Sequence, residues 1–203
     1  MKIEKFSKNK DKYRVLLSTG EVIDIYDEVI IKYNLLYKKE LTEELLNEIK
    51  EFNNYISAYN DAMKYLSIRL RAESEINNYL MKKKYDTKII DYVIDRLKKN
   101  CLINDLVFSK AFIHDKLEFT SVGKYKIKEE LNKLKINSET ISNVLEDIDE
   151  ELWNERINNL INKYLKKKTK YSGNVLKNKI YIYLVNLGYD KSLVINNLSN
   201  YDF

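Results

Sequence analysis

Apolar and polar residues alternate near the amino-terminal end of the chain. Tyr13, Val15 and Leu17 fall on one face of an extended run, and a turn around Gly20 separates them from a second apolar run. Alternation interrupted by a glycine turn predicts a β-hairpin. A lone hairpin is only marginally stable in water, so we expect it to pack on the residues that follow. Asp27 is placed to cap a short helix directly after it.

The pattern then changes to a helical period. Thr42 offers an N-cap, and Glu43 and Glu44 would lie in the first turn, where the helix dipole favours negative charge. Beyond them apolar residues recur at steps of three and four, which predicts one long amphipathic helix with a narrow apolar seam. The seam consists of Leu45, Ile49, Phe52, Ile56, Tyr59, Met63, Leu66 and Leu70. We expect it to pack within its own chain, and a two-stranded coiled coil is the alternative.

Five apolar positions recur three times along the rest of the chain, at offsets of 51 and 53 residues. Steps of four at either end of each set fit helical faces, and the longer steps between them mark an interruption. Each copy is therefore predicted to be a helix, a tight turn and a second helix. The three sets are Ile76, Leu80, Tyr85, Ile90 and Ile94; Ile127, Leu131, Ile136, Ile141 and Leu145; and Ile180, Leu184, Tyr189, Val194 and Leu198.

The turn before the second helix has the same chemistry in every copy. A short polar residue there can accept a hydrogen bond from the first amides of the next helix, which is worth about 1 kcal/mol per cap. These residues are Asp86, Asn137 and Asp190. Gly188 lies just before the third turn, where a left-handed residue can close a helix. Lys84 and Lys135 hold that place in the other copies, at an expected cost of up to about 1 kcal/mol each.

A further helix precedes each pair. The end of the long seam supplies the first of these helices. Asp105 can start the second, which carries Phe108 and Phe112, and Trp153 and Ile157 mark the third. The predicted fold class is mainly α: three tandem three-helix repeats, helix-turn-helix-like, in an elongated curved array, preceded by a small N-terminal β-hairpin region. The expected divisions are 1–40 for the β-hairpin and short helix, 41–100 for the long helix and first repeat, 101–149 for the second repeat and 150–203 for the third.

Amino-acid composition and net charge limit the classes of protein to which this chain can belong. Lys and Arg total 36 against 31 acidic residues, giving a net charge of +5, which suits an anionic partner without approaching a histone-like charge. Lys, Asn, Ile and Tyr are abundant, a bias that an AT-rich genome imposes, so lysine runs are less informative than usual. The single cysteine, Cys101, excludes an internal disulfide framework. With no secretory or membrane-spanning segment in sight, we expect a cytoplasmic protein.

No catalytic constellation is recognisable in the sequence. His114 is the sole histidine, and neither it nor Cys101 has the partners that a metal site or an activated nucleophile requires. Gly123 and Gly173 lie near helix starts, but neither belongs to a phosphate-binding loop pattern. We therefore expect a protein that is not an enzyme and needs no cofactor.

Basic residues gather at several helix ends and connections. They are candidates for contact with DNA phosphate or an acidic protein surface, although lysines on a helix face are most often merely solvated. The candidates are Arg69, Arg71, Lys82, Lys83, Lys84, Arg96, Lys98, Lys99, Lys124, Lys126, Lys163, Lys166, Lys167, Lys168 and Lys170. The run from Lys163 to Lys170 is the strongest, with a plain linker as its alternative. Arg69 and Arg71 could equally cap a helix or pair with Glu73 or Glu75.

Several stretches resemble one known family. YLSIRLRAESEINNYLMKKKYD, residues 65–86, resembles the RecX regulatory proteins, whose pattern runs Tyr-Leu, Arg, Arg-Ser-Glu, Glu-Leu, Leu and Lys-Gly-Tyr. CLINDLVFSKAFI at 101–113 and SVGKYKIKEELNKLKI at 121–136 resemble later stretches of the same family. Residues 13–35 and 40–49 are similar to the amino-terminal extension of members from low-GC Gram-positive bacteria. Departures from the family pattern fall at turns and caps: Leu70, Ala72, Lys84 and Lys135 stand where it favours Pro, Ser, Gly and Gly.

This resemblance implies a regulator of the RecA recombinase, acting in DNA repair and recombination. RecX proteins bind the recombinase filament on single-stranded DNA, lie along its helical groove, and modulate its ATP hydrolysis, strand exchange and co-protease activity, usually downward. The implied partners are the RecA filament and single-stranded DNA, with double-stranded DNA as a second nucleic-acid candidate. A curved array could touch successive subunits of the filament and gain avidity from several weak contacts. We expect the free protein to be a monomer.

Two other function classes remain open at this point. A stand-alone DNA-binding protein built of tandem helix-turn-helix units would explain the helix pairs and the positive charge, and a protein-interaction scaffold would explain the repeats alone. Binding to bare single strands, compared with binding to recombinase-coated strands, separates these classes from a recombinase regulator.

Overall fold

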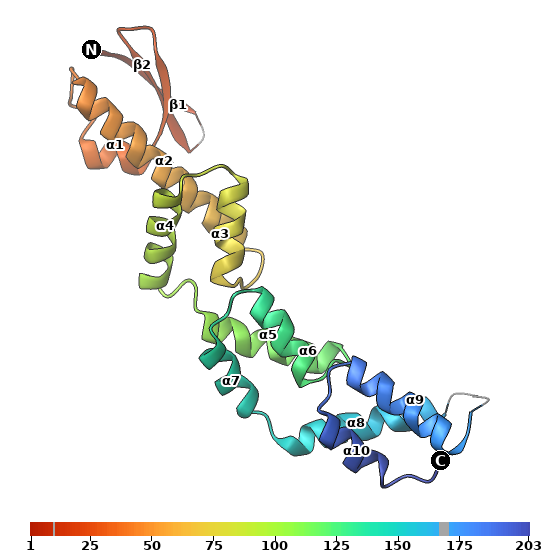
Figure 1. The fold of residues 1–203 in the computed structure, drawn as a ribbon. Helices are drawn as coiled ribbons and strands as arrows, with labels where there is room; N and C mark the ends of the chain where they lie inside the picture. The colour runs from red at the N-terminus through yellow and green to blue at the C-terminus, as the bar shows by residue number, and fades with distance from the viewer. Residues whose placement is uncertain (10, 167–170) are drawn as a thin grey trace. The chain divides into compact units, whose positions relative to one another are not determined.

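The computed structural model describes residues 1–9, 11–166 and 171–203. Within them the chain is mainly helical and begins with a small antiparallel sheet (Figure 1), so the predicted fold class is confirmed. The chain divides into two compact units, Met1–Ile103 and Asn104–Phe203. Unit 1 holds the sheet and the first three-helix repeat, and unit 2 holds the second and third repeats.

The amino-terminal sheet has three strands in the order β1 (Ile3–Asn9), β2 (Lys12–Leu17) and β3 (Val22–Tyr26). The predicted hairpin is present as β2 and β3, with Val15 opposite Ile23. The prediction was wrong in stopping at two strands, because β1 also pairs with β2 and places Phe6 opposite Val15. A strand rich in lysine at the edge of a sheet has only weak apolar alternation to announce it.

Two helices follow the sheet, α1 (Asp27–Tyr33) and α2 (Glu43–Leu66). Asp27 is the first helical residue of α1 rather than its cap, which is Tyr26. Thr42 caps α2 as predicted, since its hydroxyl oxygen accepts a hydrogen bond from the Leu45 amide at 3.2 Å. The predicted seam was too long at its end, because α2 stops at Leu66.

The sheet is fixed to α2 by one side chain. The Asn53 side-chain amide donates to the Asp24 carbonyl at 3.0 Å, and its oxygen accepts from the Tyr26 amide at 3.0 Å. Both backbone groups lie in β3. The hairpin therefore packs on the helix that follows it, as the marginal stability of an isolated hairpin demands.

The three predicted repeats are three-helix units in the structure, and in each the three helices pack on one another (Figure 1). The first consists of α2, α3 (Glu73–Lys82) and α4 (Thr87–Lys99); the second of α5 (Asp105–Phe119), α6 (Lys124–Lys133) and α7 (Ser138–Glu146); the third of α8 (Glu150–Leu165), α9 (Gly173–Asn186) and α10 (Lys191–Leu198). All of the recurring apolar positions are buried except Tyr85, which is half-buried. Its hydroxyl lies 3.0 Å from that of Ser57.

The predicted caps differ in detail from one repeat to the next. Asn137 accepts a hydrogen bond from the Glu139 amide at 2.8 Å, and Asp190 accepts from the amides of two residues in the first turn of α10. Asp86 is the N-cap of α4 but forms no side-chain cap bond, so this part of the prediction was wrong. Its carbonyl accepts from the Ile89 amide instead. In the second repeat α5 begins at Asp105, as predicted, and Asn104 caps it.

Left-handed residues end the first helix of each pair, as predicted. Lys84 has φ +65°, Lys135 has φ +58° and Gly188 has φ +90°. A side chain in this conformation crowds the following carbonyl, whereas glycine adopts it freely. Lys84 and Lys135 therefore store strain that Gly188 avoids.

Replacing Lys84 or Lys135 with glycine should stabilise the protein. We expect each substitution to raise the free energy of unfolding by up to about 1 kcal/mol, because relief of backbone strain exceeds the extra entropy of glycine in the unfolded chain. Urea unfolding of the full chain measures the change. Lys128→Gly, inside α6, is the control and should destabilise by about 1 kcal/mol. A loss of stability in both turn variants would contradict the strain argument.

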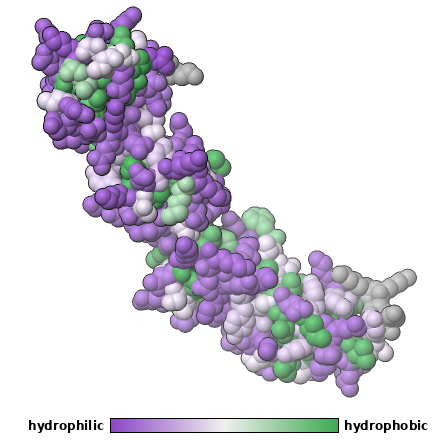
Figure 2. All heavy atoms as spheres, turned by 45° about the horizontal axis from the view of Figure 1, so that its top comes forward, coloured by the Kyte–Doolittle hydropathy of each residue, from purple (hydrophilic) through white to green (hydrophobic). Residues whose placement is uncertain are grey.

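The face drawn in Figure 2 is largely hydrophilic, with apolar side chains in small separate patches. Of the helices in the described part of the chain, none combines the length and the apolar character needed to cross a bilayer.

Candidate functional site

Arg69 and Arg71, in the connection between α2 and α3, converge on one carboxylate. Arg69 makes two hydrogen bonds to Glu75, at 2.6 and 3.3 Å, and Arg71 makes one at 3.4 Å. The Arg71 guanidinium also lies over the ring of Tyr65, 4.0 Å from its centre, and only 11% of its side chain is exposed. The sequence offered two structural roles for these arginines, helix capping and pairing with an acidic residue. The structure shows the pairing, with Glu75. Arg71 is built into the fold, while Arg69 keeps half of its side chain in solvent.

Glu75 also holds the start of α3. Its carboxylate accepts a hydrogen bond from the Ala72 amide at 3.1 Å, which is one half of a capping box. Ala72 is the N-cap and has no side-chain oxygen, so the other half is missing. Burial alone would raise the pKa of Glu75, but the hydrogen bonds from Arg69 and the Ala72 amide and the charges of both arginines outweigh it and lower this pKa.

The lysines at the far end of α3 are more available. Lys83 lies 3.5 Å from the Asp61 carboxylate, whose charge raises the pKa of Lys83, and its ammonium is 5.6 Å from the ring centre of Tyr79. Lys82 and Lys84 are exposed and form no ion pair within the described residues. They can meet an anionic partner without breaking a contact of the fold.

The basic end of α4 has one side chain held by contacts within the fold, that of Arg96, and two that are exposed, those of Lys98 and Lys99. Arg96 donates a hydrogen bond to the Tyr55 hydroxyl at 3.1 Å and lies 4.2 Å from the ring centre of Tyr59. Lys98 pairs with Glu73 at 2.7 Å. Lys99 is exposed, and no ion pair involves it in the part of the chain that the structure describes. The structure thus brings Arg69, Arg71 and Lys98 together around two acidic residues of α3, and leaves Lys99 free.

The candidates of unit 2 lie at two separate places. Lys124 begins α6, and Lys126 in its first turn is 3.9 Å from Glu129. Lys163 and Lys166 are exposed at the end of α8 and, among the described residues, have no ionic partner. The remaining candidates of this run, Lys167, Lys168 and Lys170, lie outside the described residues. We call Lys82, Lys84, Lys99, Lys163 and Lys166 the outward lysines.

Sequence reasoning missed the aromatic partners of Arg71 and Arg96, which are both half-buried. Tyr65 carries Arg71 on its ring and stacks on Tyr79, with ring centres 4.2 Å apart and planes within 5°. Arg71 and Tyr65 are separated by a helix end, and Arg96 and Tyr59 by a whole helix. Neither pair has the three- or four-residue spacing that would have revealed it.

Comparison with known proteins decides the family. A family description named "RecX, first three-helix domain" matches residues 58–97, which span the end of α2, α3 and α4. The Regulatory protein RecX of Listeria monocytogenes serotype 4a is 31% identical over 95% of this chain and 73% of its own length. The Streptococcus pneumoniae serotype 19F protein of the same name is 33% identical over 95% of this chain and 74% of its own length. The chain belongs to the RecX regulatory protein family.

Solved RecX structures share the fold. A crystal structure of regulatory protein RecX superimposes with a TM-score of 0.82, at 21% identity, over 96% of this chain and 98% of the other. RecX from Lactobacillus salivarius gives a TM-score of 0.69, at 23% identity, over 72% of this chain and 96% of the other. The arrangement of helices around the candidate residues is thus a RecX arrangement.

The four residues that the sequence analysis set apart from the RecX pattern lie at turns and caps in the structure. Leu70 is 53% exposed in the connection after α2, and Ala72 is an N-cap without a side-chain acceptor. Lys84 and Lys135 have a positive φ, which glycine adopts without strain.

Proposed function

We propose that this RecX protein binds the RecA recombinase filament on single-stranded DNA and lowers its ATP hydrolysis, strand exchange and co-protease activity. The observation that carries the proposal is membership of the RecX family, with about a third of residues identical to regulatory RecX proteins across 95% of the chain. The protein would act in the cytoplasm, as a monomer and without a catalytic site of its own.

The repeats provide a physical means of binding a filament. Each repeat carries exposed basic residues of its own, and contacts made by several repeats along one ligand add through a high effective concentration. No single contact then needs to be strong. A protein of this kind can bind a repeating polymer tightly while binding isolated subunits weakly.

Among the candidate residues, we propose that the outward lysines make the contacts with phosphate or with an acidic recombinase surface. They keep their ammonium groups in solvent, whereas Arg71 and Arg96 are held by aromatic rings and hydrogen bonds. Arg69, Lys83 and Lys98 can contribute beside the outward lysines of unit 1, and Lys124 and Lys126 can contribute from their separate place at the start of α6. Lysine contacts to phosphate make affinity fall with salt.

A charge-removal series tests the proposal. We expect the combined variant Lys82→Ala, Lys84→Ala and Lys99→Ala to bind RecA-coated single strands roughly tenfold more weakly at moderate salt, and its log–log salt slope to fall by about 2, at about 0.7 per charge on a single strand. Fluorescence anisotropy of labelled DNA, with RecA ATPase followed in parallel, measures both effects. Alanine keeps the backbone strain at position 84, so the change reports charge.

The matched control removes three charges elsewhere in unit 1. Lys5→Ala, Lys38→Ala and Lys39→Ala lower the net charge equally, at exposed positions outside the candidate set. This control should bind and inhibit like the unmodified protein. Equal losses in both triple variants would show that only net charge matters and would count against a defined contact surface.

A stand-alone DNA-binding protein is the second candidate function, favoured by the helix pairs joined by tight turns and by the net charge of +5. It differs in one measurable respect. Equal affinity for bare and RecA-coated strands, without any change in ATPase, would support it over recombinase regulation.

A further inference from the structure

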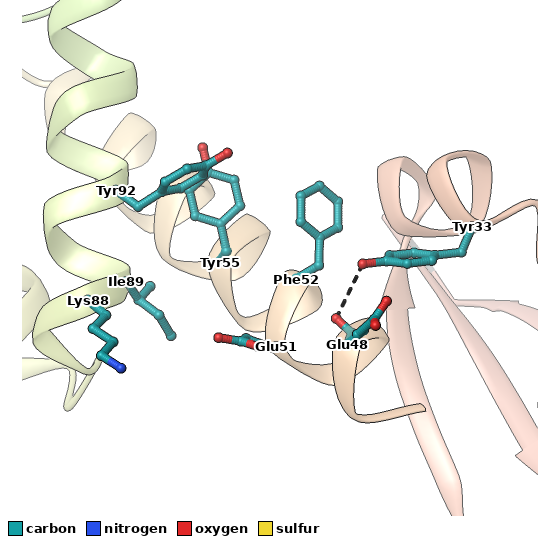
Figure 3. A pocket seen from close by; sticks show the side chains of 8 residues that line it. All are labelled: Tyr33, Glu48, Glu51, Phe52, Tyr55, Lys88, Ile89 and Tyr92. Atoms are coloured by element: carbon teal, nitrogen blue, oxygen red, sulfur yellow. Dashed lines mark hydrogen bonds between the residues drawn. The ribbon is translucent and has the colours of Figure 1, made fainter. Parts of the chain in front are cut away.

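A groove of about 410 Å³ opens in unit 1 where α1, α2 and α4 meet (Figure 3). Four aromatic side chains from these helices form a row along it: Tyr33, Phe52, Tyr55 and Tyr92. Its volume suits one or two inserted side chains better than a folded surface. None of these residues belongs to the basic candidates described above.

The aromatic row is held in place by ring contacts. Tyr55 and Tyr92 meet edge to face with centres 4.3 Å apart, and Phe52 lies 6.0 Å from Tyr33 in a similar T-shaped arrangement. The Tyr33 hydroxyl donates to the Glu48 carbonyl at 3.5 Å. Tyr55 is buried, whereas Tyr92 is 59% exposed and leaves its ring open to a ligand. A preformed row of rings, in which Tyr92 is open to solvent, requires little reorganisation on binding.

The charges along the groove favour a cation. Glu48 and Glu51 are exposed beside the rings, and within the described residues neither carboxylate has an ionic partner (Figure 3). Burial, with the negative charges of these two residues, raises the pKa of Tyr33. Among the described residues that line the groove, Lys88 is the one with a cationic side chain. Two carboxylates at the rim would repel a nucleic-acid phosphate.

The chain itself already places an ammonium group on these rings. Lys32 has its Nζ atom 3.4 Å from the ring centre of Phe52 and 5.3 Å from that of Tyr33. Attraction between a cation and the face of an aromatic ring strengthens as water is excluded from the pair. The position of Lys32 thus shows that the rings of Phe52 and Tyr33 accept an ammonium group.

We propose that this groove binds an arginine or lysine side chain of a partner protein, presented by a segment with apolar residues on either side. The cation would lie over the exposed ring of Tyr92 and pair with Glu51 or Glu48, while the flanking apolar residues would cover Ile89. This surface is separate from the outward lysines and has the opposite chemistry. The protein would then have two kinds of contact surface in unit 1, one for anionic and one for cationic groups.

Nuclear magnetic resonance of the full chain, titrated with short peptides, tests the proposal. The probe is acetyl-Gly-Leu-Arg-Leu-Gly-amide, and its counterpart has Glu in place of Arg. We expect the arginine peptide to shift the amide signals of Phe52, Ile89 and Tyr92 saturably, and the glutamate peptide to leave them unchanged. Equal effects of both peptides, no binding up to millimolar concentration, or shifts confined to other residues would each overturn the proposal.

Variants expected to weaken binding, together with one expected to strengthen it, separate the effect of charge from nonspecific hydrophobic binding. Glu51→Gln and Tyr92→Ala should each weaken the arginine peptide by roughly fivefold, while Lys88→Ala should strengthen it by roughly twofold. Tyr37→Ala, an exposed tyrosine outside the groove, is the control and should change nothing. Unchanged affinity in Glu51→Gln, which keeps the shape of an exposed side chain, would refute the assignment. Dimers of the chain that vanish in Tyr92→Ala would identify a second copy as the occupant and overturn the choice of a separate partner.

Discussion

Gly123→Ala should destabilise unit 2 by about 3 kcal/mol, because it forces a methyl group into the backbone of a neighbouring repeat. A Cβ atom at Gly123 would lie 2.5 Å from the Gly188 carbonyl carbon and from the Tyr189 nitrogen. Neither is the end of a flexible side chain. The Gly123 amide also donates to the Leu187 carbonyl at 2.8 Å, and the Tyr125 amide to the Gly188 carbonyl at 2.8 Å. Any shift that admits the methyl group lengthens both hydrogen bonds.

Urea unfolding followed by fluorescence measures this loss, since Trp153 is the sole tryptophan and lies buried in unit 2. The control is Gly173→Ala. Gly173 has a positive φ, of +58°, but no atom lies within 4 Å of the position that a Cβ atom would take there, so only the backbone cost of about 1 kcal/mol applies. If Gly123→Ala proved no more harmful than Gly173→Ala, the close approach of the two backbones would be refuted.

This contact joins the second and third repeats of unit 2. The Tyr125 hydroxyl donates to the Asp190 carboxylate at 2.8 Å, and Arg156 donates to the Leu117 carbonyl at 2.5 Å. Hydrogen bonds from Ser192 and Tyr125 lower the pKa of Asp190 to about 2. The residue predicted as a simple helix cap therefore also binds the second repeat. These hydrogen bonds hold the second and third repeats against each other within unit 2.

Sequence periodicity predicted most of the fold because the buried positions of each repeat recur at fixed intervals along the sequence. Ile127 and Leu131, for example, are buried at a spacing of four within α6, and their counterparts behave alike. The strand β1 escaped prediction because its lysines obscure the alternation. The contact between Gly123 and Gly188 was not predicted, because periodicity describes single helices and strands. It does not show which residues pack together when they lie 65 positions apart.

The candidate site was predictable only in part, for the same reason. Exposure of Lys82 and Lys99 follows from their place on an amphipathic helix. The pairings of Lys83 with Asp61 and of Lys98 with Glu73 depend on tertiary packing between helices. Sequence therefore predicts where basic residues gather, and only the fold separates those that are already engaged from those that remain open to a partner.

Glu75→Ala should destabilise unit 1 by about 2–3 kcal/mol, the second large effect. The substitution removes the hydrogen bond that caps the Ala72 amide and takes away the carboxylate that pairs with the largely buried Arg71. Loss of a cap costs about 1 kcal/mol, and a buried donor left without its partner costs about 1–3 kcal/mol. Thermal unfolding followed by circular dichroism measures the change. Arg69→Ala, which removes an exposed partner of the same carboxylate, is the matched control and should cost at most about 1 kcal/mol.

The pH dependence gives this prediction a second signature. The pKa of Glu75 is lower in the folded protein than its ordinary value of 4.5, so the unfolded chain binds its proton more readily. The stabilisation is fully present above pH 4.5 and is lost as the pH falls through the folded-state pKa. We therefore expect the stability difference between the unmodified protein and Glu75→Gln to shrink below about pH 4.5. No difference near neutral pH would show that Glu75 acts through its shape alone, because glutamine keeps that shape without the charge. A difference that stayed constant down to about pH 3 would contradict the lowered pKa.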